Sequence, residues 1–236
     1  MNRKQPYDYS GFSLRRLNEP RFAHAKLLAG WIGYFALYFV TENLIPPERC
    51  HVIHGALDDL IPFCEGFVVF YVGWYLLVAG ALAYTFFYDV KSFKKLQTYI
   101  MITQAVAMLC YIVYPSIQDL RPETFPRRNV LTLLLGFIYS FDTPTGVCPS
   151  LHAAYSFGIL SVAWKDRQFP AGAKAALAVF VLGVCAGVCF VKQHSYIDVV
   201  AALPVCLFAE MVVYGKDYWI PKWRKRDGGA VRESAN

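Results

Sequence analysis

Six apolar segments, each about as long as a membrane is thick, constrain this chain more than any other feature. A bilayer core needs about 20 apolar residues per helix. Charged residues make up only 17% of the chain and cluster between the apolar segments, whereas an average soluble domain has about 25%. The sequence therefore predicts an all-α polytopic membrane protein with six transmembrane helices, at 26–45, 64–88, 96–115, 150–164, 171–191 and 194–214.

The fourth segment is short, and an apolar run at 129–141 precedes it. That run is too short to span a bilayer, so we expect a short interfacial or re-entrant helix there. The chain then divides into a tail at 1–22, a six-helix membrane domain at 23–215 and a basic tail at 216–236.

Lysine and arginine are distributed unevenly between the two predicted membrane faces. All but five of the 23 lie in the two tails and in the loops at 89–95 and 165–174. Positive residues favour the cytoplasmic side, so both termini are expected there, in a plasma membrane. This pattern explains the net charge of +6 without nucleic acid as a partner. The other five lie on the non-cytoplasmic face: Arg49, Arg121, Arg127, Arg128 and Lys192.

The seven cysteines are scattered and show no CxxC spacing, which argues against a disulfide framework or a zinc site. Cys50 and Cys148 fall in segments on the same predicted face. A bridge between these two stays open, and unpaired thiols are the expectation.

Polar residues gather in three stretches on the non-cytoplasmic face: DLRPE at 119–123, CPSLH at 148–152 and KQHSYID at 192–198. In the third, His194 and Asp198 are four residues apart and would share one face of a helix. A carboxylate on one imidazole nitrogen fixes the tautomer and leaves the other nitrogen nucleophilic. We expect His194 to attack phosphorus and Asp198 to orient it.

The other two stretches supply an acid and charge. Ser150 suits the N-cap of a helix whose free amides could hold a phosphate, and His152 in its first turn could protonate a leaving oxygen. Arg121 can grip phosphate oxygens in a bidentate manner, and Lys192 adds a second cation. Together they predict a phosphoryl-transfer site with a phosphohistidine intermediate, released by water.

Simpler interpretations apply to the same residues. The two histidines could be structural, Arg121 could reach towards lipid headgroups, and Lys192 could be a topology anchor. His152, His194 and Asp198 would be enough for a catalytic zinc, but nearby cations would repel the ion. We expect no metal and no cofactor.

These stretches resemble the type 2 phosphatidic acid phosphatase superfamily, whose pattern is Lys-x6-Arg-Pro, Pro-Ser-Gly-His and Ser-Arg-x5-His-x3-Asp. Arg121–Pro122, PSLH at 149–152 and HSYID at 194–198 match in order, within roughly residues 60–210. Leu151 replaces the family glycine, Tyr114 the first lysine, and Gly187–Val188 the Ser-Arg pair. PSLH and KQH are similar to a divergent branch that includes inositol phosphorylceramide synthases.

The resemblance implies a metal-independent integral membrane enzyme with a six-helix core that acts on lipid phosphates. The leading hypothesis is a lipid phosphatase that cleaves a phosphate monoester or diphosphate. The alternatives are a phosphotransferase that passes a phosphorylated headgroup to a lipid hydroxyl, and a lipid-binding relative without catalysis. The substrate-binding residues are then Arg121, Ser150 and Lys192, with His194, His152 and Asp198 as catalytic residues.

Overall fold

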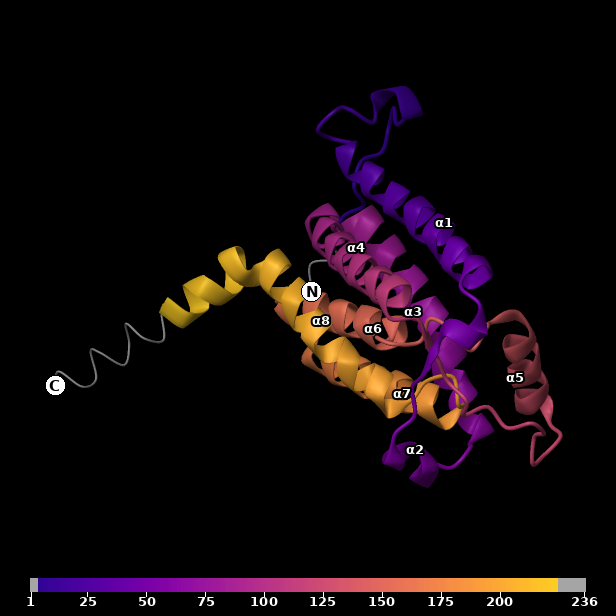
Figure 1. The fold of residues 1–236 in the computed structure, drawn as a ribbon. Helices are drawn as coiled ribbons and strands as arrows, with labels where there is room; N and C mark the ends of the chain where they lie inside the picture. Colours follow the sequence, from indigo (N-terminus) through magenta and orange to yellow (C-terminus); the bar gives the residue numbers. More distant parts are fainter. Residues whose placement is uncertain (1–3, 225–236) are drawn as a thin grey trace.

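The computed structural model describes residues 4–224 and is mostly helical (Figure 1). Two very short strands and several single-turn 3-10 segments connect the helices. The helices are α1 (Ala29–Leu44), α2 (Ala56–Leu60), α3 (Val68–Tyr88), α4 (Val90–Val113), α5 (Val130–Phe141), α6 (Leu151–Lys165), α7 (Ala171–Phe190) and α8 (Tyr196–Tyr214).

Four helical stretches are long and apolar enough to cross a membrane: Glu65–Tyr88, Val90–Val113, Ala171–Phe190 and Tyr196–Arg224. They confirm that the chain suits a membrane. The other two expected spans form α1, with 16 residues, and α6, with 15. At 1.5 Å per residue these helices measure roughly 24 and 22 Å, against a bilayer core of about 30 Å.

Helix α4 begins six residues before the apolar segment that predicted it. Asp89 is its N-cap, and the Asp89 carboxylate accepts the amide of Ser92 at 3.0 Å. The first turns of α4 carry three lysines of the expected 89–95 loop, yet Phe93 between them is fully buried. A capped start and one buried aromatic side chain thus convert a charged loop into helix.

Helix α6 lies at the centre of the bundle and packs against α3, α4, α7 and α8, while α1 packs on the outside of α4 (Figure 1). Small residues allow this close packing. A Cβ on Gly158 of α6 would come within 2.6 Å of the Tyr99 ring of α4. The shortest helix of the core is therefore also the most enclosed, and the residues at its start are held from several sides.

At the site end of the bundle, the segments that follow α1 and α4 pair with each other and with the segment before α6. Strand β1 (His51–Val52) lies parallel to β2 (Ser116–Ile117), and Ile117 bridges to Thr145. Gly146 follows with φ +61°, a backbone conformation that glycine adopts without strain. These contacts bring three connecting segments to the start of α6.

Candidate active site at the paired histidines

His194 contacts both residues that the sequence analysis paired with it. Its Nδ1 lies 3.0 Å from Asp198 Oδ2, and its Nε2 lies 3.3 Å from Nδ1 of His152. The predicted contact with Asp198 is present, but its origin differs from a shared helix face. His194 precedes α8, and the carboxylate reaches back from the first turn, where it also accepts the Ser195 amide at 3.0 Å.

The end of α7 brings His194 to this position through a tight reversal. The amide of Lys192 donates to Cys189 O at 3.1 Å and that of Gln193 to Val188 O at 2.9 Å. This is the double hydrogen bond of a Schellman motif, whose left-handed position is usually a glycine. Here Lys192 occupies it with φ 55°, and such a conformation costs a non-glycine residue about 1–2 kcal/mol.

The Lys192 ammonium binds α2 in this structure. It donates to the carbonyl oxygens of Asp58, at 3.0 Å, and Ile61, at 2.6 Å. These carbonyls belong to the last turn of α2, where a cation is favourable. The structure therefore places this predicted phosphate-binding cation against backbone oxygens, where it fixes the loop that covers the start of α8.

Asp58 holds the start of α8 and was missed by the sequence analysis. Its carboxylate is 2% exposed, accepts Ser195 Oγ–H at 2.5 Å, and accepts the Tyr196 amide at 3.0 Å. It also accepts Gly55 N–H at 2.9 Å and so caps its own short helix. Asp58 and Asp59 are adjacent acids in the sequence, and burial in the folded protein distinguishes Asp58 from exposed Asp59.

Ser150 is the N-cap of α6, as predicted, and accepts the Ala153 amide at 3.4 Å. Its own amide donates to the carbonyl oxygen of Asp198 at 3.0 Å, which joins the starts of α6 and α8. His152 therefore faces His194. Its ring lies 4.2 Å from the Trp74 ring and 4.8 Å from the Tyr71 ring, centroid to centroid.

The hydrogen bonds assign the tautomers of both histidines. A carboxylate accepts only, so Nδ1 of His194 carries the proton and its Nε2 holds a lone pair. His152 then donates from Nδ1 to that lone pair. In the neutral ring, the nitrogen of His194 that faces away from Asp198 therefore carries the lone pair that a nucleophile requires.

Arg121 is linked to the site by its hydrogen bond to Gln193, the residue before His194. Its guanidinium donates to Gln193 Oε1 and to the carbonyl oxygens of Tyr139, Asp142 and Thr143. Burial lowers the pKa of Arg121, and the Asp142 carboxylate opposes this shift. An arginine stays charged under such conditions. Phosphate binding by Arg121 stays a prediction, and sequence reasoning missed Gln193, which accepts one of the guanidinium's hydrogen bonds.

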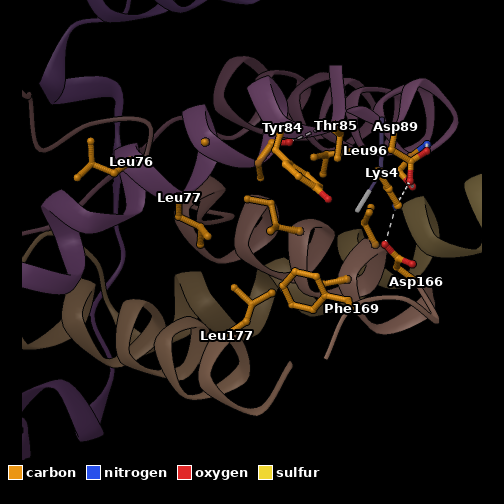
Figure 2. Close-up of a pocket in the computed structure, with 16 residues that line it drawn as sticks. Lys4, Leu76, Leu77, Tyr84, Thr85, Asp89, Leu96, Asp166, Phe169 and Leu177 are labelled. Carbon is orange, nitrogen blue, oxygen red and sulfur yellow. Dashed lines mark hydrogen bonds and ion pairs between the residues drawn. The ribbon is translucent and has the colours of Figure 1, made fainter. Parts of the chain in front are cut away.

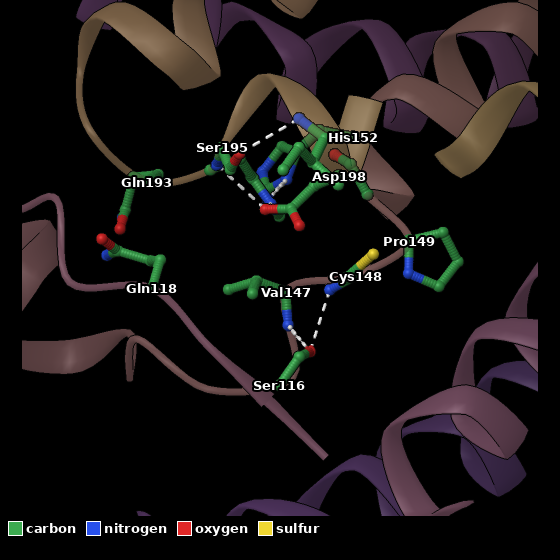
Figure 3. Close-up of polar contacts among 12 residues, drawn as sticks. Ser116, Gln118, Val147, Cys148, Pro149, His152, Gln193, Ser195 and Asp198 are labelled. Carbon is green, nitrogen blue, oxygen red and sulfur yellow. Dashed lines mark hydrogen bonds and ion pairs between the residues drawn. The ribbon is translucent and has the colours of Figure 1, made fainter. Parts of the chain in front are cut away.

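Ser116 holds the turn before α6, as Figure 3 shows. It is fully buried, and its Oγ accepts the amides of Val147 and Cys148, both at 3.1 Å. Burial, followed by the charge of Asp198, raises the pKa of the Cys148 thiol to about 12. This thiol stays protonated at neutral pH, so it does not compete with His194 as a nucleophile. Cys50 and Cys148 are both free.

Several buried polar atoms in this region have no hydrogen-bond partner within the described residues: His152 Nε2, Trp74 Nε1, Arg121 Nε, Asp198 Oδ1 and Gln118 Nε2. Most buried polar groups in proteins are paired, and Gln118 faces Gln193 across the site (Figure 3). Such a concentration of unpaired donors and acceptors is typical of a place that receives a polar ligand.

Two further acids lie away from this cluster. Glu65 binds Arg127, with Nε at 2.9 Å from Oε1, and Asn129, at 3.0 Å, so it does not contact Arg121. Asp59 accepts a hydrogen bond from the exposed His54. Within residues 4–224, no group of three or more histidine, cysteine, aspartate or glutamate side chains is arranged to hold a metal ion.

We compared the chain with protein-family models, with curated proteins and with solved structures, and none of these comparisons gave a match.

Proposed function

We propose that this protein is a membrane enzyme that cleaves a phosphate monoester or diphosphate of a lipid through a phosphohistidine. The observation that carries the proposal is the Asp198–His194–His152 chain, with 3.0 Å between the first pair and 3.3 Å between the second. The similarity of its three stretches to the type 2 phosphatidic acid phosphatase superfamily supports the same chemistry.

In this mechanism His194 Nε2 attacks phosphorus while the Asp198 carboxylate stabilises the imidazolium that forms. His152 enters the step as an imidazolium, gives its Nδ1 proton to the leaving lipid oxygen and ends as a neutral imidazole. Phosphorus must enter between two rings that now touch, so the contact at 3.3 Å opens when substrate binds. Water then attacks phosphorus and passes a proton to His152, the N–P bond breaks, and phosphate leaves with Nε2 of His194 free and His152 protonated again.

Two groups in reach could offset the charge of the phosphoryl group. The first-turn amides of α6 lack intrahelical partners, and they lie beside His152. On the other side, Arg121 donates to Gln193, next to His194, whereas the Lys192 ammonium is bound to α2. A phosphate oxygen that replaces Gln193 Oε1 on Arg121 would gain a charge-assisted hydrogen bond. We therefore assign phosphate binding to Arg121 and Ser150's helix, and a positioning role to Lys192.

The proposal places all six apolar segments across a plasma membrane with both termini in the cytoplasm. Helix α1 is extended by a 3-10 segment at Ala23–Leu28, which brings it to on the order of 36 Å. Helix α6 is enclosed by four neighbours, and α5 lies at the membrane surface near the site. The histidines then face the non-cytoplasmic side. Thiol-labelling tests this arrangement at two positions that are exposed in this structure: an impermeant reagent should reach a cysteine at position 124 but not one at 91.

The decisive experiment measures phosphate release from phosphatidic acid, phosphatidylglycerophosphate and a polyprenyl diphosphate, in detergent with EDTA. We expect wild-type activity to survive EDTA and His194→Ala to lose it by about 10³-fold or more. His51→Ala is the matched control, because His51 is exposed and stacks on Tyr114. Activity that persists in His194→Ala would disprove a phosphohistidine on this residue.

A substrate with a good leaving group distinguishes the role of His152 from that of His194. A general acid contributes about 10²–10⁴-fold when it must protonate a poor leaving group. His152→Ala should therefore lose activity on a lipid monoester but retain most of it on nitrophenyl phosphate. His194→Ala should lose both. Equal losses for His152→Ala on the two substrates would remove the general-acid assignment.

The burial of the site favours a second candidate, transfer of the phosphorylated headgroup to a lipid hydroxyl. Asp198 is fully buried, His194 is 7% exposed and Trp74, whose ring lies against that of His152, is 8% exposed. An enclosed site disfavours attack by water. A new phospholipid formed with an added acceptor lipid, without free phosphate, would identify a transferase. If neither product forms, the chain is a lipid-binding protein without catalysis.

A further inference from the structure

A separate cavity of about 300 Å³ lies between α3, α6 and α7, away from the histidines (Figure 2). It meets α6 from Ile159 to Asp166, so it begins roughly 10 Å along the helix axis from His152. Leucine, isoleucine, valine and alanine side chains form most of its wall. A cavity of this size suits a small ligand or part of a lipid tail.

The cavity opens sideways as well as at its end. Leu76 and Tyr84 both line it and are 73% and 47% exposed on α3. In a bilayer these two positions on α3 face lipid tails. An aliphatic chain could therefore slide in from the membrane without crossing water.

One end of the cavity is charged, and its charge is negative on balance. The Lys4 ammonium lies between Asp89 and Asp166, 2.7 Å from Oδ2 of Asp166 (Figure 2). All three side chains are 19% exposed. Two carboxylates face one ammonium, so an anionic headgroup would be repelled and a cationic one attracted. Lys4 itself, four methylenes ending in an ammonium, has the shape of such a ligand.

We propose that this cavity binds a single-chain amphiphile with a primary amine headgroup, whose tail lies between α3, α6 and α7. Its ammonium takes the place of the Lys4 ammonium between Asp89 and Asp166. Lys4 belongs to a strap that crosses the ends of α3 and α4, where Tyr7 N–H donates to Phe87 O at 2.6 Å and Tyr9 Oη–H to Phe86 O at 2.7 Å. Binding therefore replaces the ammonium of Lys4, which is attached to the chain, with the ammonium of the free amphiphile.

The test uses the full-length protein in phosphatidylcholine nanodiscs and a dodecylamine that carries a diazirine near its methyl end. We expect crosslinks on α3 and on the second half of α6. Unlabelled dodecylamine should compete better than dodecanol by roughly tenfold or more, because hydrogen bonds between charged groups are the stronger ones. Dodecanoate should compete least. Equal competition by all three, or the best competition by dodecanoate, would overturn the proposal.

Two kinds of variant sharpen the test. Gly80 lines the cavity, and a Cβ there would meet no atom within 4 Å, so Gly80→Leu should fill the space without strain and abolish labelling. Gly33→Leu on α1, which also meets no atom within 4 Å, should leave labelling unchanged. Ala81→Phe is a second filling variant. Labelling that survives both filling variants would show that the amine binds elsewhere.

Two substitutions at the charged end of the cavity should change dodecylamine binding in opposite directions. A tethered competitor acts at an effective concentration on the order of millimolar, so Lys4→Ala should raise the apparent affinity for dodecylamine by about tenfold. Asp166→Asn should reduce the advantage of dodecylamine over dodecanol. Lower affinity in Lys4→Ala would overturn the exchange, because Lys4 would then be part of the binding site. None of these readouts depends on phosphate release.

Discussion

Buried charge is arranged differently at the two ends of the helix bundle. Away from the histidines, Lys165 pairs with Glu210 at 2.5 Å, and Glu210 also accepts hydrogen bonds from Ser161, at 2.6 Å, and Trp219, at 2.6 Å. Lys165 lies 4.1 Å from the centroid of the Tyr214 ring. No buried polar atom of these side chains lacks a partner among the described residues, although Nδ1 of His24, which lies against Phe86 and Phe93 at the same end, has none. At the histidine end, by contrast, five buried polar atoms lack partners.

The two arrangements suit different purposes: polar groups that are all paired stabilise the fold, and unpaired polar groups can bind a ligand. A closed set of ion pairs and hydrogen bonds holds helices together and has no capacity for a ligand. A set with unpaired atoms lowers the stability of the fold, because buried polar groups without partners are unfavourable. The same unpaired atoms can form hydrogen bonds with a ligand. Substitutions at the two ends should accordingly affect different measurements: activity at the histidines and stability at Lys165.

Among the substitutions that compare the two ends, the largest effect is expected for Asp198→Asn. The asparagine can still accept the Ser195 amide, but it cannot stabilise an imidazolium with a full charge. We expect phosphate release to fall by about 10²–10⁴-fold with little change in melting temperature. Asp59→Asn, at an exposed carboxylate, is the control. A loss of stability as large as the loss of activity would place Asp198 with the structural groups.

Lys165→Met should have the opposite signature. It leaves the Glu210 carboxylate, 14% exposed, without its cation, and we expect a cost of roughly 1.5–3 kcal/mol. The double variant Lys165→Met/Glu210→Leu should recover most of that loss. Denaturation in detergent measures both, and Lys91→Met on the exposed face of α4 should change stability by less than about 0.5 kcal/mol. A large fall in activity per folded molecule would contradict the separation of the two ends.

Substitutions of Lys192 test a residue that lies beside the histidines but has a structural contact, because it joins a strained turn to α2. Lys192→Met removes the hydrogen bonds of a buried ammonium and keeps the left-handed backbone, at a cost of roughly 1–3 kcal/mol. Lys192→Gly removes the same bonds but relaxes the backbone, so it should be less destabilising by about 1 kcal/mol. Thermal melting compares the two. A glycine variant that is the less stable one would show that the turn is not strained.

His54 should give the smallest effect, and it depends on pH. Hydrogen bonds to Asp119 and then Asp59 raise the pKa of His54 above 6.5 in the folded protein. Protonated His54 therefore adds stability below about pH 6.5, and this contribution is lost as pH rises through the folded-state pKa. His54→Gln should narrow the melting difference between pH 5.5 and pH 8 by a small amount. An unchanged difference would show that the contacts are screened by solvent.

Apolar length predicted the helices well wherever it was the dominant signal. Helix α7 at Ala171–Phe190 lies within one residue of its predicted limits. The start of α4 was missed because its first turns are charged, and only the Asp89 cap and buried Phe93 reveal it. Helix α6 at Leu151–Lys165 also lies within one residue of its predicted limits. For α1, the apolar segment at 26–45 overstated the α-helix, because Ala23–Leu28 forms a 3-10 segment before Ala29–Leu44.

At the site, motif residues were easier to predict than the residues that support them. The spacing of His194 and Asp198 indicated a contact, and Pro149–Ser150 indicated a helix start. Neither spacing nor composition distinguishes Gln193 from a solvated loop residue, or Tyr71 from the many other aromatic residues of the spans. Asp58 acts across 137 positions of sequence, and such a contact exists only once the fold brings the two segments together.

Because of this long separation, the ribosome makes Asp58 well before it makes Ser195. At about 5–20 residues per second, a ribosome needs on the order of ten seconds to make the intervening chain. During that interval the Asp58 carboxylate has its own loop's Gly55 amide as a partner, but neither Ser195 nor Tyr196. Insertion of the last helix completes the carboxylate's hydrogen bonds and carries His194 to His152 in the same event. A nascent chain interrupted before α8 therefore holds an unfinished acidic loop and no paired histidines.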